Sequence, residues 1–232
     1  YAAFPIYGTD RPVIISRLIG AKYVLCSLQK FFSHFRNSKY PIDCSPINAQ
    51  EQMMSLLTGI TKEKLIDVPN VMELPDIKLP VIENIKDYIV LIPTSTRTTK
   101  EFPIEITNDI ISSLKNNKIV FLGSGKFAQD YSEKLAEYNF DNLVDLSGKT
   151  SLLDAAVIIK NSKAVIAADT GLMHMSCALN KPTLTLFFEK NSGAFMPKKE
   201  LYNCKVISDD YSIENIIKSL NEIIGEKECI NV

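Results

Sequence analysis

The stretch that decides the fold is Ala-Val-Ile-Ala-Ala-Asp-Thr-Gly-Leu-Met-His, residues 164–174. Its first five residues are an apolar run that predicts a buried strand, and the pattern from Met175 to Asn180 predicts a helix. A carboxylate, a hydroxyl, a glycine and one of only two histidines therefore lie in one strand-to-helix turn. In a parallel α/β sheet such turns lie at the carboxyl edge, where ligands bind.

The same alternation of strand and helix extends over residues 88–225. Apolar runs predict six strands, at 88–92, 118–122, 142–146, 164–168, 183–188 and 205–208. Helical patterns lie between and after them: from Pro103 to Leu114, around Tyr131 to Ala136, from Ser151 to Lys160, over 171–180 and from Ser212 to Ile224. Ser151 with Asp154 predicts a capping box. Continuously apolar strands are typical of a parallel sheet that helices cover on both faces, so we predict an α/β fold.

Residues 1–82 have too few strand-like runs for a second domain of this kind. We expect the last part of a partial α/β domain there, with an amphipathic helix over 47–57 and a linker that carries Pro69, Pro75 and Pro80. We predict the complete domain over residues 83–232. A length of 232 residues fits one domain plus a piece of another.

Composition excludes several classes of protein. With 26 basic and 27 acidic residues the net charge is −1, which gives no bulk attraction to nucleic acid. Five cysteines without a Cys-x-x-Cys pair indicate neither a disulfide framework nor a zinc site. No apolar run reaches the roughly 18 residues of a membrane span, and no signal-peptide pattern opens the chain. We therefore expect a cytoplasmic protein, and peripheral attachment to a membrane stays open.

Polar and small residues gather directly after each predicted strand, at 93–100, 123–126, 147–150, 169–171 and 189–193. Because the carboxyl ends of parallel strands share one edge, these segments predict one crevice rich in hydroxyls, glycines and Lys or Arg. Such a crevice suits a nucleoside diphosphate. The backbone of Thr170 and Gly171 would open a helix whose N-terminus attracts anions. Arg97 and Lys100 would neutralise a charge of about −2 to −3 without a metal.

Each of these features also has an ordinary structural interpretation. Asp169 or Thr170 is suited to be a helix N-cap, and His174 to be a core histidine. Gly123 and Gly125 do not complete a G-x-G-x-x-G phosphate loop, because Ala128 stands at the third position. The hydroxyl-rich run at 94–99 is also compatible with a solvated loop.

Taken together, these residues resemble glycosyltransferase family 9, the lipopolysaccharide heptosyltransferases. The likeness is most specific at 169–187, an Asp-Thr-Gly-x-x-His signature followed by a helix and a strand. It also includes a hydroxyl-rich loop with Lys-x-aromatic-Pro at 95–103, a glycine-bearing strand end at 122–126, and a nucleoside-side segment at 143–153. The resemblance covers residues 88–225 and extends weakly to 14–57.

The resemblance implies a GT-B architecture, with two Rossmann-like domains of which the second binds the donor. It implies transfer of a sugar, typically heptose from ADP-heptose, to a lipopolysaccharide-type glycolipid acceptor with inversion and without an essential metal or other cofactor. It places this chemistry in the cytoplasm, with peripheral contact at the inner membrane left open. The implied donor-binding residues are Ser95, Thr96, Lys100, Gly123, Lys149, Thr150, Asp169, Thr170, Gly171, Leu172 and His174.

Within that set the roles differ. Ser95, Thr96, Lys100, Thr170 and Gly171 would hold the diphosphate, and Lys149 with Thr150 would lie beside the base and ribose. Lys100 and Asp169 are the predicted catalytic residues, Lys100 on the leaving group and Asp169 facing the sugar, while His174 would support the turn. The family's general base lies near the start of the acceptor domain, a segment that we expect to be absent here.

The sequence departs from the family pattern at several positions. Phe188 stands where a glycine is usual, Met173 where some relatives have a small polar residue, and Asp130 is the one acidic residue near the expected ribose partner. Three alternatives stay open: a non-catalytic nucleotide-sugar-binding module, another GT-B enzyme such as a sugar-nucleotide epimerase, and an unrelated Rossmann-like dehydrogenase. The missing G-x-G-x-x-G disfavours the last. The oligomeric state is not predicted.

Overall fold

The computed structural model of the chain describes residues 69–189 and 196–225, with residues 2–3, 15, 18–20 and 23–24. The chain divides into two compact units, Tyr1–Val68 with Gly193–Phe195, and Pro69–Ser192 with Met196–Val232. In the first unit, β1 (Ala2–Ala3) pairs in parallel with β2 (Tyr23–Val24). The helix expected at 47–57 lies outside the described residues. The proline-bearing segment 69–82 groups with the second unit.

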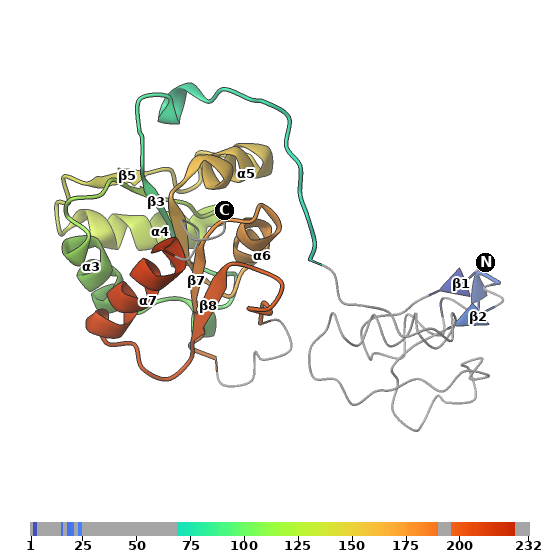
Figure 1. Ribbon diagram of the computed structural model, residues 1–232. Coiled ribbons are helices and arrows are strands. Elements are labelled where there is room, and N and C mark those ends of the chain that lie inside the picture. Colours follow the sequence, from blue (N-terminus) through green and yellow to red (C-terminus); the bar gives the residue numbers. More distant parts are fainter. Residues whose placement is uncertain are drawn as a thin grey trace. The chain divides into compact units, whose positions relative to one another are not determined.

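The second unit is built on a six-stranded sheet in which every neighbouring pair is parallel (Figure 1). Across the sheet the order is β5 (Leu143–Asp145), β4 (Ile119–Phe121), β3 (Ile89–Ile92), β6 (Ala164–Ala168), β7 (Thr183–Leu186) and β8 (Cys204–Ile207). Counted along the chain from β3, this is the doubly wound 3-2-1-4-5-6 order. The chain reverses direction across the sheet between β3 and β6, which is the switch point where such folds bind ligands. The α/β prediction is confirmed.

Helices cover both faces of this sheet. On one face lie α3 (Ile104–Ser113), α4 (Gly125–Ala136) and α7 (Ile213–Gly225), and on the other lie α5 (Leu152–Asn161), α6 (Gly171–Ala178) and the short η2 (Pro80–Ile82) (Figure 1). The predicted capping box begins α5: the Ser151 N–H donates to Asp154 Oδ2 at 2.9 Å, and the Asp154 N–H donates to Ser151 Oγ at 3.1 Å.

Alternation along the strands distributes the core between the two faces. Ile89 and Leu91 of β3 pack on the α3 side, whereas Val90 and Ile92 pack on the α5 side. All four are buried, as expected when a strand has helices on both faces. Burial of each such side chain stabilises the fold by about 1.5–3 kcal/mol relative to exposure. This core fixes the strand ends, and through them the loops of the carboxyl edge.

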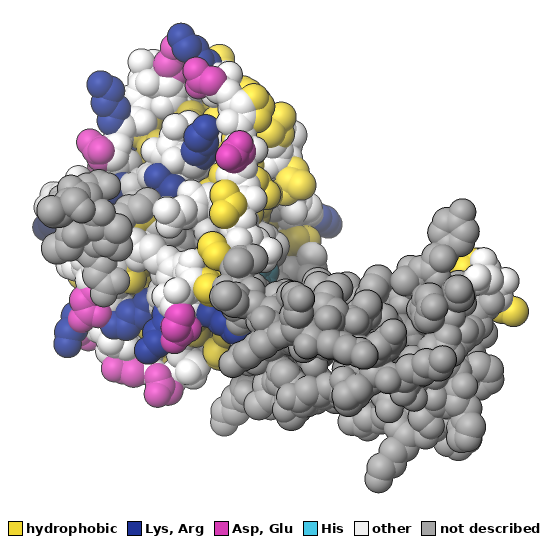
Figure 2. Space-filling view, turned by 45° about the vertical axis from the view of Figure 1, so that its right-hand side comes forward, with side chains coloured by type: hydrophobic (Ala, Val, Ile, Leu, Met, Phe, Trp, Pro, Cys, Tyr) yellow, Lys and Arg dark blue, Asp and Glu magenta, His cyan; other side chains and the backbone are white. Residues whose placement is uncertain are grey.

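Among the described residues, no helix combines the length and apolar character needed to cross a membrane. On the face of the second unit seen in Figure 2, Lys and Arg side chains are interspersed with Asp and Glu side chains. The described part of that face therefore presents no continuous patch of one charge.

Candidate functional site

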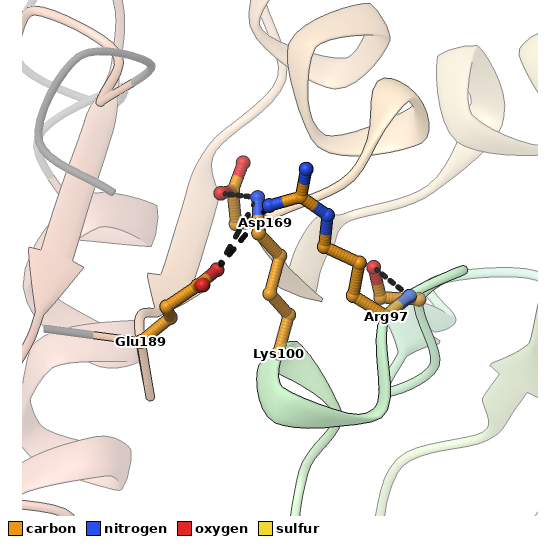
Figure 3. Close-up of polar contacts among 5 residues, drawn as sticks. Arg97, Lys100, Asp169 and Glu189 are labelled. Carbon is orange, nitrogen blue, oxygen red and sulfur yellow. Dashed lines mark hydrogen bonds and ion pairs between the residues drawn. The ribbon is translucent and has the colours of Figure 1, made fainter. Parts of the chain in front are cut away.

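Four charged side chains meet at the carboxyl edge, beside the switch point (Figure 3). Lys100, at the end of η3 (Thr98–Lys100), forms an ion pair with Asp169, which follows β6. Glu189, which follows β7, places Oε2 3.9 Å from Lys100 Nζ and 4.0 Å from Arg97 Nη1. The side chains of Lys100 and Asp169 are only 14% and 6% exposed. Two cations and two carboxylates thus form a cluster with no net formal charge.

The loop after β3 folds back on itself to present Lys100. The Phe102 N–H donates to the Pro93 carbonyl at 2.9 Å, and the Phe102 ring is buried in the core. Ser95 is also buried, and its hydroxyl accepts a weak hydrogen bond from the Arg97 N–H at 3.4 Å. Thr96 is exposed at the surface. Of the two predicted hydroxyls, Ser95 therefore contacts the loop backbone and Thr96 faces solvent.

The turn after β6 is capped by Thr170, whose hydroxyl accepts from the Met173 N–H at 3.4 Å. Gly171, the first residue of α6, has an unusual environment. A Cβ built there would have no atom within 4 Å, and its φ does not lie in the left-handed region. Neither packing nor backbone conformation requires a glycine, so an open approach to the helix N-terminus is the property that distinguishes this position.

His174 lies one turn into α6 and is exposed, so it is not a core histidine. Although the residue as a whole is exposed, protein atoms around the ring partly desolvate it, and this desolvation lowers the pKa of His174. The charge of Asp169 acts in the opposite direction and that of Lys100 in the same direction. The imidazole is therefore predominantly neutral at pH 7. Leu172, also in the first turn of α6, is partly buried on the α5 side of the sheet.

Gly123 has a packing explanation. A Cβ there would stand 2.7 Å from Ala128 Cβ and 2.9 Å from Thr94 Oγ1. The glycine therefore permits the close approach of α4 to the end of β4. Its direct contact with a donor stays a prediction.

Lys149 and Thr150 follow β5, three strands from β6 in the sheet. At about 4.8 Å per strand, this separates them from Asp169 by about 14 Å along the edge. Lys149 is exposed; its ammonium donates to the Asp145 carbonyl at 2.9 Å and pairs with Asp145 Oδ2 at 3.4 Å. Burial raises the pKa of Asp145, but hydrogen bonds from Ser147 outweigh it and the net pKa is lowered. Thus Lys149 is held beside an ionised carboxylate.

The structure shows where the three residues that depart from the family pattern lie. Phe188 packs into the core, edge-on to Phe102 with ring centroids 5.5 Å apart and stacked on Tyr211 at 4.3 Å. Met173 is fully buried on the inner face of α6, and Asp130 lies on the exposed side of α4. The Phe188 ring therefore does not cover the charged cluster. Glu189 was not among the predicted site residues, although its position directly after a strand was a signal.

No group of three His, Cys, Asp or Glu side chains suited to a metal is present in the part of the chain that the structure describes.

Residues 45–218, more than half of the chain, match the family described as Glycosyltransferase family 9 (heptosyltransferase). The chain belongs to glycosyltransferase family 9. Its signature turn, 169–174, is the one that faces Lys100 across the switch point.

Known members of family 9 show the same relationship. Lipopolysaccharide heptosyltransferase 2 of Escherichia coli is 36% identical over 73 residues, 30% of this chain and 21% of that protein. Lipopolysaccharide heptosyltransferase 1 of Salmonella typhimurium is 30% identical over 108 residues, 46% of this chain and 33% of that protein. The chain thus spans between a fifth and a third of the length of these curated relatives.

A solved structure of E. coli heptosyltransferase WaaC with ADP superposes on this family 9 chain with a TM-score of 0.69. The match covers 96% of this chain and 72% of that one, at 20% sequence identity. At this identity the likeness shows the fold, and the expected GT-B-like α/β class is confirmed.

Proposed function

We propose that the protein is an inverting glycosyltransferase that moves heptose from ADP-heptose to a lipopolysaccharide-type glycolipid, without a metal or other cofactor. The observation that carries this proposal is the placement of Lys100 and Asp169 beside the open N-terminus of α6 at the switch point. The family membership supports the reaction class. The donor is suggested by relatives, one of which was solved with ADP and with an ADP-heptose analogue.

The proposed donor lies along the carboxyl edge. Its diphosphate is held by Lys100, Thr170 and the backbone of Gly171, where an anion gains from the unpaired N–H groups of a helix N-terminus. The loop residues Ser95 and Thr96 frame the same position. The base and ribose extend toward Lys149 and Thr150, with Gly123 beneath them, and the sugar lies against Asp169. Leu172 and His174 support the turn from the following helix.

In the proposed reaction, negative charge builds on the diphosphate as the sugar leaves. The Lys100 ammonium stabilises that charge more in the transition state than in the ground state, which is the condition for a gain in rate. Asp169 holds the Lys100 side chain in place and accepts hydroxyl groups of the sugar. The general base is assigned to no described residue.

The proposed acceptor-side partner is a glycolipid, reached in the cytoplasm by peripheral contact with the inner membrane; nucleic acid is not a proposed partner. Family membership favours a transferase over a sugar-nucleotide epimerase, a non-catalytic binding module and a Rossmann-like dehydrogenase. Transfer of radiolabelled heptose to a lipopolysaccharide acceptor by this chain would distinguish a transferase from a binding module.

Calorimetric titration with ADP, UDP and GDP tests the donor site directly. We expect ADP to bind most tightly and Lys100→Ala to weaken ADP at least tenfold, since a charged hydrogen bond contributes about 1.5–3 kcal/mol. Lys115→Ala is a matched control, because this exposed lysine follows α3 at the opposite edge of the sheet. Absence of binding by all three nucleotides would overturn the donor-site assignment.

A further inference from the structure

Glu189 is a carboxylate placed among the groups that would bind a diphosphate. Its Oε2 lies 3.9 Å from Lys100 Nζ and 4.0 Å from Arg97 Nη1, and Figure 3 shows all three side chains converging. The side chain is 33% exposed, so the charge is only partly screened by solvent. Any phosphate that binds Lys100 therefore comes close to a second negative charge besides Asp169.

The residues directly before Glu189 are anchored in the fold. Phe188 is held between Phe102 and Tyr211, and the Tyr211 hydroxyl donates to the Phe187 carbonyl. Glu189 follows at a bend in the chain, and its side chain points toward Lys100 and Arg97 (Figure 3). The carboxylate is thus a built feature of the edge rather than a freely moving surface group.

The proposed donor, ADP-heptose, and the product, free ADP, differ in the charge of the diphosphate that would bind Lys100. A nucleoside diphosphate sugar carries two negative charges on its diphosphate. Free ADP carries about three near neutral pH, because the terminal phosphate loses a second proton with a pKa of about 6. Resting on the proposed function, we propose that Glu189 discriminates between them: its charge repels free ADP more than the ADP-sugar and so promotes release of the product.

The expected size of the effect follows from Coulomb's law. A phosphate bound to Lys100 would lie about 8 Å from Glu189, because Glu189 Oε2 is 3.9 Å from Lys100 Nζ and the phosphorus of a hydrogen-bonded phosphate would lie about 4 Å beyond Nζ. One extra charge at that distance changes the dissociation constant by between about twofold, at the dielectric constant of water, and about thirtyfold, at an effective value of about 20. The discrimination should also weaken as salt is raised.

The test compares ADP with ADP-heptose on the whole chain by calorimetry at pH 8 and low salt. Glu189→Gln is expected to strengthen ADP binding and to strengthen ADP-heptose binding less, so that the ratio of the two dissociation constants shifts at least twofold toward ADP. Glu189→Asp keeps the charge and should keep the wild-type direction of preference. Glu133→Gln, an exposed residue of α4, makes the same change in net charge and should leave the ratio unchanged.

The outcomes separate the two proposals. If both ligands bind but Glu189→Gln leaves their ratio unchanged, this inference is wrong and the donor site stands. Weaker ADP-heptose binding with unchanged ADP binding would mean that Glu189 contacts the sugar, which also overturns the inference. Cooperative unfolding on heating shows that wild type and each variant are folded. If neither ligand binds any of these folded proteins, the donor-site assignment itself is wrong and this inference is wrong with it.

Discussion

Replacing Gly171 by alanine separates a ligand-binding role of this glycine from a structural one. The added methyl group would meet no atom within 4 Å, and the backbone there does not require positive φ. Alanine loses less backbone entropy on folding than glycine and is the better helix former. We therefore expect Gly171→Ala to leave the free energy of unfolding unchanged or to raise it by about 0.4–1 kcal/mol.

The same substitution, Gly171→Ala, should weaken the binding of ADP. In the proposed complex a diphosphate oxygen approaches the N–H groups at the start of α6, in the space that the new methyl group would occupy. Loss of one hydrogen bond to a charged group costs about 1.5–3 kcal/mol. The dissociation constant for ADP should therefore rise at least tenfold, which corresponds to about 1.4 kcal/mol.

The assay pairs urea unfolding with calorimetric titration of ADP on the same protein sample. Gly225→Ala is the matched control: a Cβ there also meets nothing within 4 Å, but Gly225 ends α7 at the opposite edge of the sheet. It should leave ADP affinity as it is in wild type. An ADP dissociation constant within twofold of wild type for Gly171→Ala would refute the diphosphate position. A loss of stability above 1 kcal/mol would show that the space is not open.

Three further changes test other parts of the reasoning. Gly123→Ala should destabilise the fold by about 1–3 kcal/mol in urea unfolding, because its Cβ would stand 2.7 Å from Ala128 Cβ; wild-type stability would contradict that packing. Lys100→Ala should lower kcat about 10²–10³-fold in transfer assays, and an unchanged kcat/KM would exclude its role on the leaving group. The lowered pKa of His174 means that the folded state binds a proton less readily than the unfolded state. The neutral imidazole therefore stabilises the fold at a pH above the unfolded-state pKa of this residue, and this stabilisation is lost as the pH falls below that value. Wild type should therefore lose more stability than His174→Gln between pH 7.5 and pH 5 in urea unfolding, and equal losses would exclude this linkage.

Much of the scaffold could be predicted because its signals are local. Continuous apolar runs marked the strands, and the Ser151–Asp154 spacing marked the start of α5. The convergence of Lys100 and Asp169 on one edge follows from parallel pairing alone. The ion pair between them does not, because it depends on the fold of the loop that ends at Phe102.

The orientation of the Glu189 side chain could not be predicted from the sequence for a related reason. Which of residues 188 and 189 faces the core is decided by Tyr211 and Phe102, which lie far from them along the chain. In the same way, the requirement for glycine at position 123 comes from Ala128 and Thr94, which contact it only in the folded sheet. Tertiary packing of this kind has no signature in a local window of sequence.

The ring of Phe188, packed between Phe102 and Tyr211, ties together the segments that follow β3, β7 and β8. The aromatic side chains thus hold the loops in place, whereas the charges are carried by nearby residues at positions 97, 100 and 189. Substitutions at the charged positions can alter ligand preference while the anchor keeps the loops in register. This arrangement would allow the charge at the proposed donor site to be changed without a change in the scaffold.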